Sequence, residues 1–316
     1  MGRQLISGII VLLLAVSHGI AFADMDCNDP EEKKLAAKVK DAMDRADKSG
    51  KPDQLYVAYQ GVINNGYCLS KAVQDRARAA NLTKLGRDAA AKAEAAGLLY
   101  SDAPVGGEGK TSAFAWFETL GAFADADRVM LKAVHAKPDD IKLFQAAWET
   151  GERARHPSDG GDKSYKAPAS YRQELEKAAA ASAAKLMAAE EKDAAGLTGN
   201  IMTVGAAAPQ SLKKLEQAAD WMKFTPGGDK PAKTRAEQRG DVIMKQGNYM
   251  MADFAERYYR FAGSPKAVEA KKKGEEGQRA MEQSAKKVES SITHKSEADQ
   301  KKFDKGKANL EKELGF

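Results

Sequence analysis

The stretch GNYMMADFAERYYRFAGSP, residues 247–265, has an earlier counterpart in GAFADADRVMLKAVHAKP, residues 121–138. Each begins with a glycine, continues with the mixed apolar and charged residues of an amphipathic helix, and closes with a proline. A glycine can end a preceding helix in the left-handed conformation, and a proline disfavours continuation of the helix before it. The two stretches therefore predict two helix–turn–helix pairs, each with its glycine at the turn.

The match extends into the interior of both stretches. An aromatic residue follows the glycine by two positions, an alanine comes three positions later, and another packing residue follows after seven more. In chain order these positions, with the closing proline, are Gly121, Phe123, Ala126, Ala133 and Pro138, and then Gly247, Tyr249, Ala252, Tyr259 and Pro265. We expect the aromatic residue to pack against the preceding helix and the alanine to let two helices approach closely. Gly240 occupies a second close-contact position, on the preceding helix of the later pair.

This pattern resembles the tetratricopeptide repeat, a helix–turn–helix unit of about 34 residues. The resemblance places units at about 107–140 and 233–266, with weaker ones over most of the remaining chain, including 192–225. It implies an all-α fold, a right-handed α-solenoid of antiparallel helix pairs. An irregular bundle of antiparallel helices is the alternative interpretation.

The resemblance also implies a binding groove, because the first helix of each tetratricopeptide unit lines the inner surface. We expect this groove to carry both charges and to suit an extended peptide or another protein's surface, although such residues are also compatible with an ordinary exposed face. The expected groove residues are Thr111, Glu118, Lys142, Gln145, Glu149, Arg153, Glu237, Asp241 and Lys245.

The first 23 residues have the pattern of a secretory signal peptide. Arg3 precedes an apolar run over about residues 9–16, and Ala21-Phe22-Ala23 forms a small-x-small cleavage site. An uncleaved anchor is the alternative, but the apolar run is short for a membrane span of about 20 residues. We expect the mature chain to have no integral membrane span and to lie in a bacterial periplasm, with secretion as the alternative.

The two cysteines, Cys27 and Cys68, follow this signal. An even pair in an exported protein predicts one disulfide, which would join the N-terminal segment to the end of the second helix. Two free buried thiols are the alternative.

The rest of the chain is rich in helix-favouring residues and shows no strand-like alternation. We divide it into a helical region at 24–106, repeat-like helices at 107–266 and C-terminal capping helices at 267–316. Loops interrupt the repeat region at 156–168 and 226–232. We further expect separate helices at about 199–204 and 210–224, and a new helix near Ser296.

Catalytic and cofactor sites are not expected. PVGGEGKTSAF, residues 104–114, resembles a phosphate-binding loop, but Pro104 stands where the motif requires glycine and the preceding segment is helical. We expect Lys110 and Thr111 to begin a helix instead. The three histidines of the mature chain, His135, His156 and His294, are isolated, so they predict no metal site. Adjacent carboxylates such as Glu190-Glu191 diverge by about 100° on a helix and indicate solvated faces.

Charge and composition complete the functional hypothesis. The formal net charge is +5, and +4 without Arg3, too balanced and too evenly mixed to favour nucleic acid. We expect a non-catalytic periplasmic scaffold or adaptor that binds protein. The alternative is a carrier that holds an apolar or lipid ligand against Trp221-Met222-Phe224 and Tyr249-Met250-Met251; core packing also explains those residues.

Overall fold

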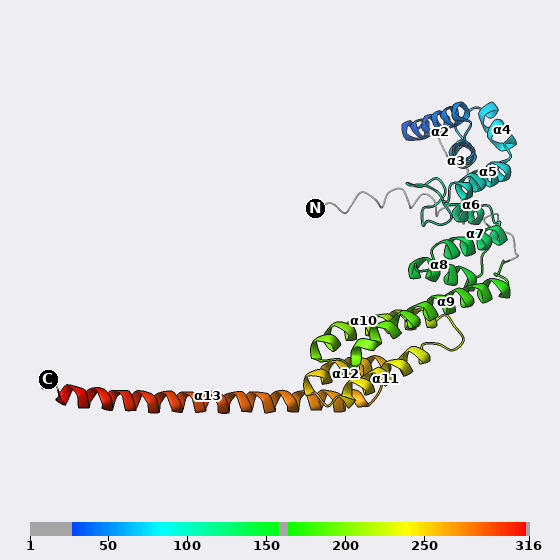
Figure 1. Cartoon of the computed structure of the whole chain (residues 1–316). Helices are drawn as coiled ribbons and strands as arrows, with labels where there is room; N and C mark the ends of the chain where they lie inside the picture. Colours follow the sequence, from blue (N-terminus) through cyan, green and yellow to red (C-terminus); the bar gives the residue numbers. More distant parts are fainter. Residues whose placement is uncertain (1–26, 158–163, 314–316) are drawn as a thin grey trace. The chain divides into compact units, whose positions relative to one another are not determined.

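The computed structural model describes residues 27–157 and 164–313, and these ranges are helical apart from loops and one isolated β-bridge between Arg155 and Tyr165. Twelve α-helices, α2 to α13, and two 3-10 helices, η2 and η3, make up this described part (Figure 1). The all-α prediction is confirmed. The expected signal peptide, residues 1–23, lies outside the described residues.

The helices pack mostly against their neighbours in sequence. Their bounds are α2 Pro30–Ser49, α3 Pro52–Asn65, α4 Lys71–Ala79, α5 Leu82–Ala95, α6 Ala113–Thr119, α7 Phe123–Ala136, α8 Ile141–Glu152, α9 Ala169–Ala194, η2 Ala195–Thr198, α10 Ile201–Met222, α11 Lys230–Lys245, η3 Tyr249–Met251, α12 Ala252–Ala262 and α13 Lys266–Glu313. None of the helices within residues 27–157 and 164–313 combines the length and the apolar character that a membrane crossing requires.

The chain forms two compact units. Among the described residues, the first unit comprises 27–130, 154–157 and 164–165, and the second comprises 131–153 and 166–313. The domain boundaries drawn from the sequence, at residues 107 and 267, remain a prediction.

In the first unit, helix α2 begins and ends at residues that supply partners for free backbone groups. The Asp29 carboxylate accepts hydrogen bonds from the backbone N–H groups of Glu31, at 2.8 Å, and Glu32, at 3.3 Å. Gly50 ends the helix with φ 62° and donates its N–H to Ala46. Helices α2, α3 and α4 then share one small apolar core, formed by Met43, Ala46, Ala58, Val62 and Ala77.

A disulfide joins Cys27 to Cys68 across 41 residues of sequence. The predicted pairing is therefore confirmed. It connects the residues just before α2 to the turn between α3 and α4. The neighbouring Tyr67 donates a hydrogen bond to the carboxylate of Glu32 in the first turn of α2. That bond, together with burial, raises the pKa of Tyr67 to about 12.

In the second unit, α10 is one helix, so the prediction of two helices over 199–224 was wrong. Asn200 caps its start by accepting from the N–H groups of Met202 and Thr203, both at 3.0 Å. Pro209 lies inside the helix on its exposed face, next to the buried Ala208. The backbone bond that proline removes is lost on the solvent side, where water can replace it. The repeat unit expected at 192–225 therefore has no turn within α10.

Helix α13 also differs from the sequence expectation, because it runs unbroken from Lys266 to Glu313 and no new helix begins at Ser296. Lys295 and Glu297 flank that serine, and residues 266–313 contain no proline. A serine caps a helix only where the chain before it leaves the helical conformation, and nothing in this segment forces that departure.

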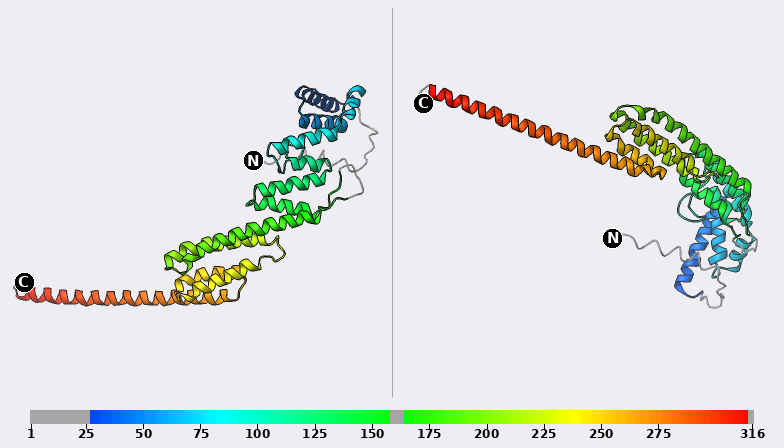
Figure 2. Two further views of the ribbon diagram at one scale, coloured as in Figure 1. Left: turned by 45° about the vertical axis from the view of Figure 1, so that its right-hand side comes forward. Right: turned by 90° about the horizontal axis from the view of Figure 1, so that it is seen from below.

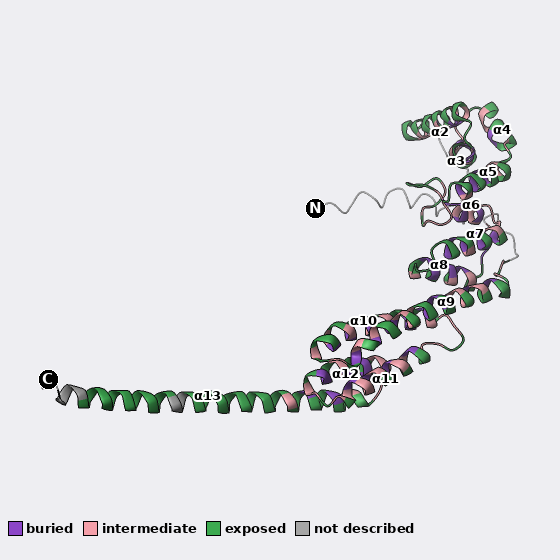
Figure 3. Cartoon of the chain, viewed as in Figure 1, coloured by how far each residue is buried: buried purple, intermediate pink, exposed green. Residues whose placement is uncertain are grey.

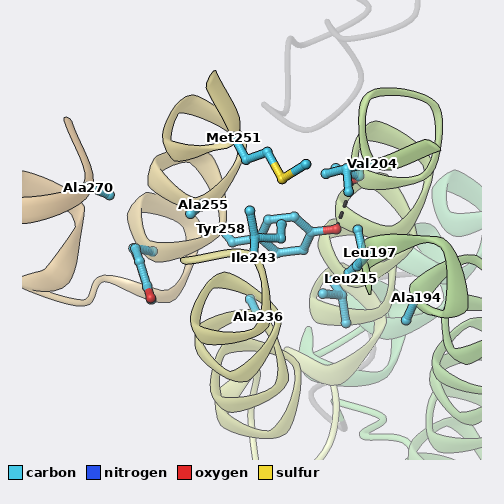
Figure 4. Packing of buried hydrophobic residues seen from close by; sticks show 12 residues of the cluster. Ala194, Leu197, Val204, Leu215, Ala236, Ile243, Met251, Ala255, Tyr258 and Ala270 are labelled. Carbon is cyan, nitrogen blue, oxygen red and sulfur yellow. Dashed lines mark hydrogen bonds between the residues drawn. The ribbon is translucent and has the colours of Figure 1, made fainter. Parts of the chain in front are cut away.

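The core of the second unit lies where α10, α11 and α12 meet (Figure 4). Tyr258 extends from α12 towards Val204 and Leu215 of α10, and its hydroxyl donates to the backbone carbonyl of Ala208 at 3.0 Å. Ile243 of α11 is fully buried in the same cluster. Burial raises the pKa of Tyr258 to about 12, consistent with a phenol enclosed by apolar side chains.

Close helix contacts in both units place a bulky side chain where a glycine leaves space. In the first unit, a Cβ on Gly86 would lie 2.7 Å from the side chain of Leu120. In the second unit, a Cβ on Gly151 would lie 2.8 Å from the ring of Tyr171. Any larger residue at these glycines would push the two segments apart.

The repeat-pattern residues occupy both turns and contacts. Gly121 and Gly247 adopt φ 64° and 74°, in the left-handed region that favours glycine at a helix end. Ala126, Ala133 and Ala252 are buried, whereas Pro138 is exposed.

The two aromatic residues of the later pattern face glycines. Gly240 faces Tyr259, whose ring would lie 2.7 Å from an added Cβ. Tyr249 differs from the expectation of packing back on the preceding helix. Its ring lies against Gly277 of α13, where the absence of a side chain leaves room for it. A Cβ added to Gly277 would lie 2.1 Å from the ring.

Substitution of Gly240 tests the glycine contact. We expect Gly240→Ala to destabilise the second unit by about 1–3 kcal/mol, because the added methyl group must displace the Tyr259 ring. Urea unfolding measures the change. Gly205→Ala is the matched control, since its Cβ would lie at an ordinary 3.6 Å from Phe254 and alanine favours helix by up to about 1 kcal/mol. Equal effects of the two substitutions would contradict the contact.

Removal of the disulfide tests its contribution to the first unit. The bond closes a loop of 41 residues, for which chain entropy predicts a loss of about 3–4 kcal/mol in the Cys27→Ser, Cys68→Ser variant. Denaturant unfolding is followed by tryptophan fluorescence in a Trp148→Phe, Trp221→Phe background, so that Trp116 alone reports, and it reports on this unit. Reductant should lower the stability of the wild-type chain by the same amount and leave the variant unchanged. A variant as stable as the oxidised chain would refute the prediction.

Candidate functional site

An open cavity of about 570 Å³ lies in the first unit between helices α2 and α3 and the glycine-rich loop that precedes α6. Lys38, Ala42 and Arg45 come from one face of α2, since they are spaced four and three residues apart. The remaining lining residues are Val39 and Ala46 from α2, Asp53, Gln54, Val57, Ala58 and Gly61 from α3, Gly106, Gly107, Gly109 and Thr111 from the loop, and Trp116 from α6.

The glycines let the loop approach α3. Gly106 has φ 79°, and a Cβ there would lie 3.4 Å from the side chain of Val57. Gly109 has φ 105°, a conformation that L side chains rarely adopt. The loop therefore approaches the α2–α3 pair through backbone conformations that only glycine adopts without strain.

Two residues of the stretch that resembles a phosphate-binding loop, Lys110 and Thr111, bond within the loop itself, Lys110 through its backbone carbonyl and Thr111 through its hydroxyl. The Thr111 hydroxyl lies 3.5 Å from the Pro104 carbonyl oxygen, and the Lys110 carbonyl accepts from the Ser101 hydroxyl at 3.3 Å. The helix begins at Ala113, so Lys110 and Thr111 precede it, and the expectation that they lie in its first turn was wrong. Ser112 caps the helix by accepting from the Ala115 N–H at 3.3 Å.

The cavity has an apolar floor and a charged rim. Trp116 is 2% exposed, and its indole meets the Tyr56 ring edge-on at 5.1 Å between centroids. Val57, by contrast, is 38% exposed on the cavity wall. Lys38, Arg45 and Asp53 are exposed around them. Apolar side chains can enter such a cavity while the rim binds polar or charged groups, an arrangement typical of ligand and peptide sites.

The predicted groove residues fall into three groups. Thr111 lines the cavity just described. Lys142, Gln145 and Glu149 are exposed along one face of α8, Arg153 is exposed just after α8, and Lys245 is exposed at the end of α11. Glu118, Glu237 and Asp241 are instead held by bonds to cations within their own unit.

Lys266, at the start of α13, holds two of these carboxylates in the second unit. Its ammonium lies 3.2 Å from Glu237 and 2.9 Å from Asp241. Tyr259 also donates to Asp241 at 2.7 Å. Burial favours the neutral form of Asp241, but the hydrogen bonds from Lys266 and Tyr259 lower the pKa of its carboxyl below the usual value.

Arg155 is the centre of a buried network in the first unit that the sequence did not indicate. It is 4% exposed, its guanidinium donates to Glu118 at 2.5 Å, and it also donates to the buried Asp127. Tyr165 donates to the second oxygen of Asp127 at 2.8 Å. Burial alone would lower the pKa of Arg155, and the bonds to Glu118 and Asp127 raise it above its usual value.

Aromatic rings enclose the same guanidinium. It lies 5.1 Å from the Phe123 ring centroid and 4.9 Å from that of Tyr165. Backbone bonds between Arg155 and Tyr165, at 2.9 and 2.7 Å, close the loop between them. Nothing in the sequence just after α8 indicates that Arg155 is buried. Its role follows from the tertiary structure, which brings Tyr165 back beside it.

A second buried ion pair lies in the second unit, and it corrects the interpretation of Glu190-Glu191 as a solvated face. Glu190 is fully buried and accepts from Ser211 at 2.6 Å and from Arg239 at 3.0 Å. Glu191 stays exposed and also accepts from Arg239, at 2.6 Å. The 100° between neighbouring helix positions separates the two carboxylates as expected, but one of them faces α10 and α11.

An aromatic cavity of about 620 Å³ lies in the second unit beside Trp148, with Tyr171 and Leu175 among its lining residues. The Arg172 guanidinium lies 4.4 Å from the Trp148 ring centroid. The aromatic residues suggested for a carrier cavity pack into protein instead: Trp221 and Phe224 each lie 5.0 Å from the Phe144 ring.

Metal-binding groups do not converge in the described residues. Across residues 27–157 and 164–313, no cluster of three histidine, cysteine or acidic residues could hold an ion. His135 and His156 are both exposed.

Replacement of Arg155 tests the buried network. We expect Arg155→Met to destabilise the first unit by about 3–5 kcal/mol, because Asp127 would stay buried without its cation. Arg78→Met, exposed on α4 of the same unit, should change stability by less than about 0.5 kcal/mol. Unfolding monitored by Trp116 fluorescence, again in the Trp148→Phe, Trp221→Phe background, compares the two variants, and similar stabilities would refute the assigned role.

The chain matches no protein-family model, no curated protein and no solved structure.

Proposed function

We propose that the protein is an exported, non-catalytic interaction protein that binds an extended segment of a partner protein in the bacterial periplasm, as a scaffold or adaptor. The signal-peptide pattern of residues 1–23 and the Cys27–Cys68 disulfide support an oxidising compartment. The helical pairs and the glycine turns at Gly121 and Gly247 support a tetratricopeptide-like arrangement of repeats in a right-handed solenoid.

The cavity of about 570 Å³ in the first unit is the observation that carries this proposal. Val57 offers exposed apolar surface, and Lys38, Arg45 and Asp53 offer charges of both signs at the rim. An extended peptide alternates its side chains along its length, so it can place an apolar group on the floor and polar groups on the rim.

Site-directed photo-crosslinking in the native cells tests the cavity directly. A photoreactive amino acid at Val57 faces the cavity, whereas the same residue at Ile63 is the matched control on α3, outside the cavity lining and equally exposed, 37% against 38%. We expect one discrete protein adduct from position 57 and none from position 63. Adducts of equal yield from both positions, or none from either, would overturn the assignment of this site.

Charge reversal then identifies the chemistry of the bound segment. The double variant Lys38→Glu, Arg45→Glu should lower the yield of the position-57 adduct when the segment is acidic, and Asp53→Lys should lower it when the segment is basic. Loss of one or two exposed charge contacts is expected to weaken binding by about fivefold to thirtyfold. Retention of the adduct in both variants would show that the rim charges do not contact the partner.

The aromatic cavity favours a second function, a carrier of a small apolar ligand. Trp148, Tyr171 and Leu175 line it, and Glu152 and Lys166 lie at its polar edge. Organic extraction of the purified protein followed by mass spectrometry should then release a stoichiometric lipid or aromatic compound. Trp148→Ala should lose that compound, and an extract without any ligand would exclude this second function.

A further inference from the structure

Helix α13 changes its environment part of the way along its length. Near its start, Ala270 and Gly274 are buried, and Tyr249 covers Gly277. Beyond Met281, every side chain described, in residues 282–292 and 296–309, is exposed (Figure 3). Both views in Figure 2 show this part of the helix running on past the other helices of the second unit. Met281 therefore lies where the contact between α13 and its own unit ends.

Tyr249 makes the last of these contacts from the 3-10 helix η3. Its ring lies on Gly277, and its hydroxyl donates a hydrogen bond to the Met281 sulfur at 2.9 Å. Gly277 and Met281 are four residues apart, so they lie on one face of α13. A thioether sulfur is a weak acceptor. The bond by which the Tyr249 hydroxyl holds α13 is therefore a weak one.

The sulfur that accepts this bond is also open to reagents in solution, because Met281 is 51% exposed. Met202 and Met250 are the other exposed methionines in residues 27–157 and 164–313, at 82% and 45%. Exposure makes all three accessible to a small oxidant. Within the described part of the chain, Met281 differs from the other two because a hydroxyl from another element already donates to its sulfur.

Oxidation of a methionine by a hydroperoxide changes the group that accepts the bond. With hydrogen peroxide, a sulfur lone pair forms a bond to one peroxide oxygen, and the O–O bond breaks. The sulfur loses two electrons to the peroxide, and the proton of the transferred oxygen passes to the departing hydroxide, which leaves as water. The product is a sulfoxide, whose oxygen is polar and accepts hydrogen bonds more strongly than the thioether sulfur.

The position of Met281 determines what this change does to the fold. Sulfoxide formation in a core disrupts packing, but half of the Met281 side chain is already in solvent and has little packing to lose. Methionine has three rotatable side-chain bonds, so its exposed end can turn the new oxygen towards the Tyr249 hydroxyl. The hydrogen bond between η3 and α13 then gains a better acceptor.

We propose that Met281 is a reversible oxidation site, at which a hydroperoxide forms the sulfoxide and strengthens the attachment of α13 to η3 through Tyr249. Methionine sulfoxide reductases return the sulfoxide to methionine, so the change can be undone. The site lies in the second unit and does not depend on the cavity proposed for a partner in the first.

Hydrogen peroxide and hydrogen–deuterium exchange test the proposal on the full mature chain with its disulfide intact. The variant Met202→Leu, Met250→Leu leaves Met281 as the exposed methionine, and peptide mass spectrometry should find it oxidised well before Met251, which is 4% exposed. We expect backbone exchange in residues 266–281 to become about twofold to fivefold slower, the change that a modestly stronger hydrogen bond gives. Treatment with a methionine sulfoxide reductase should restore the original rate.

Tyr249→Phe is the matched control in the same background, because it keeps the ring over Gly277 and removes the hydroxyl. Met281 should still be oxidised, but exchange in residues 266–281 should not slow. Three results would overturn the proposal: no sulfoxide at Met281, exchange that is unchanged or faster in the oxidised chain, or equal slowing with and without the hydroxyl. A sulfoxide that the reductase cannot remove would overturn its reversibility.

Discussion

Close approach between helices at glycine is the constraint on which much of this structure depends. Tyr259 fits over Gly240, Tyr171 over Gly151, and Tyr249 over Gly277 in the second unit, and Leu120 fits over Gly86 in the first. In each case an added Cβ would lie within 3 Å of the facing side chain. A chain rich in alanine has few large side chains with which to fill a core. Short distances between helices compensate, because they multiply the small dispersion contacts of each buried atom.

Buried ion pairs also connect segments within each unit. Arg155 connects Glu118, Asp127 and Tyr165, and so attaches the chain after α8 to α6 and α7 within the first unit. Glu190 and Arg239 connect α9 to α11 in the second. Such pairs add little net stability, since desolvation offsets most of the Coulomb attraction, but they penalise every arrangement that leaves one partner alone. They therefore specify which segments meet.

The surfaces proposed for binding and for oxidation lie outside these buried contacts. In the first unit, α2 and α3 share an apolar core, and the Cys27–Cys68 disulfide joins the segments that flank this pair. These contacts fix the two helices that line the cavity beside Val57. In the second unit, α13 is anchored through Lys266 and Tyr249, and Met281 lies at the exposed end of that contact. One surface is a cavity with charged side chains around it, and the other is an exposed apolar side chain on a single helix.

By itself, the sequence determined the features that depend on neighbouring residues. Helix content follows from composition, and the turns at Gly121 and Gly247 follow from the need for a left-handed residue. Pairing of Cys27 with Cys68 was expected because the chain has only two cysteines and its first 23 residues have the pattern of a signal peptide. The α10 and α13 helices were misjudged at Pro209 and Ser296, because a local breaking signal does not act when packing or uninterrupted helical neighbours oppose it.

Only the tertiary structure decided which residues meet. Thr111 was the one predicted groove residue found at the cavity in the first unit, while Lys38, Arg45 and Val57 came from helices about 50 to 70 residues earlier. Glu118 was expected to be available in a groove and is held by Arg155 instead. The position of a carboxylate in the sequence predicts which face of a helix it occupies. It does not predict whether a cation far away in the sequence will bind it. Such a contact depends on the path of the whole chain, which no local sequence pattern determines.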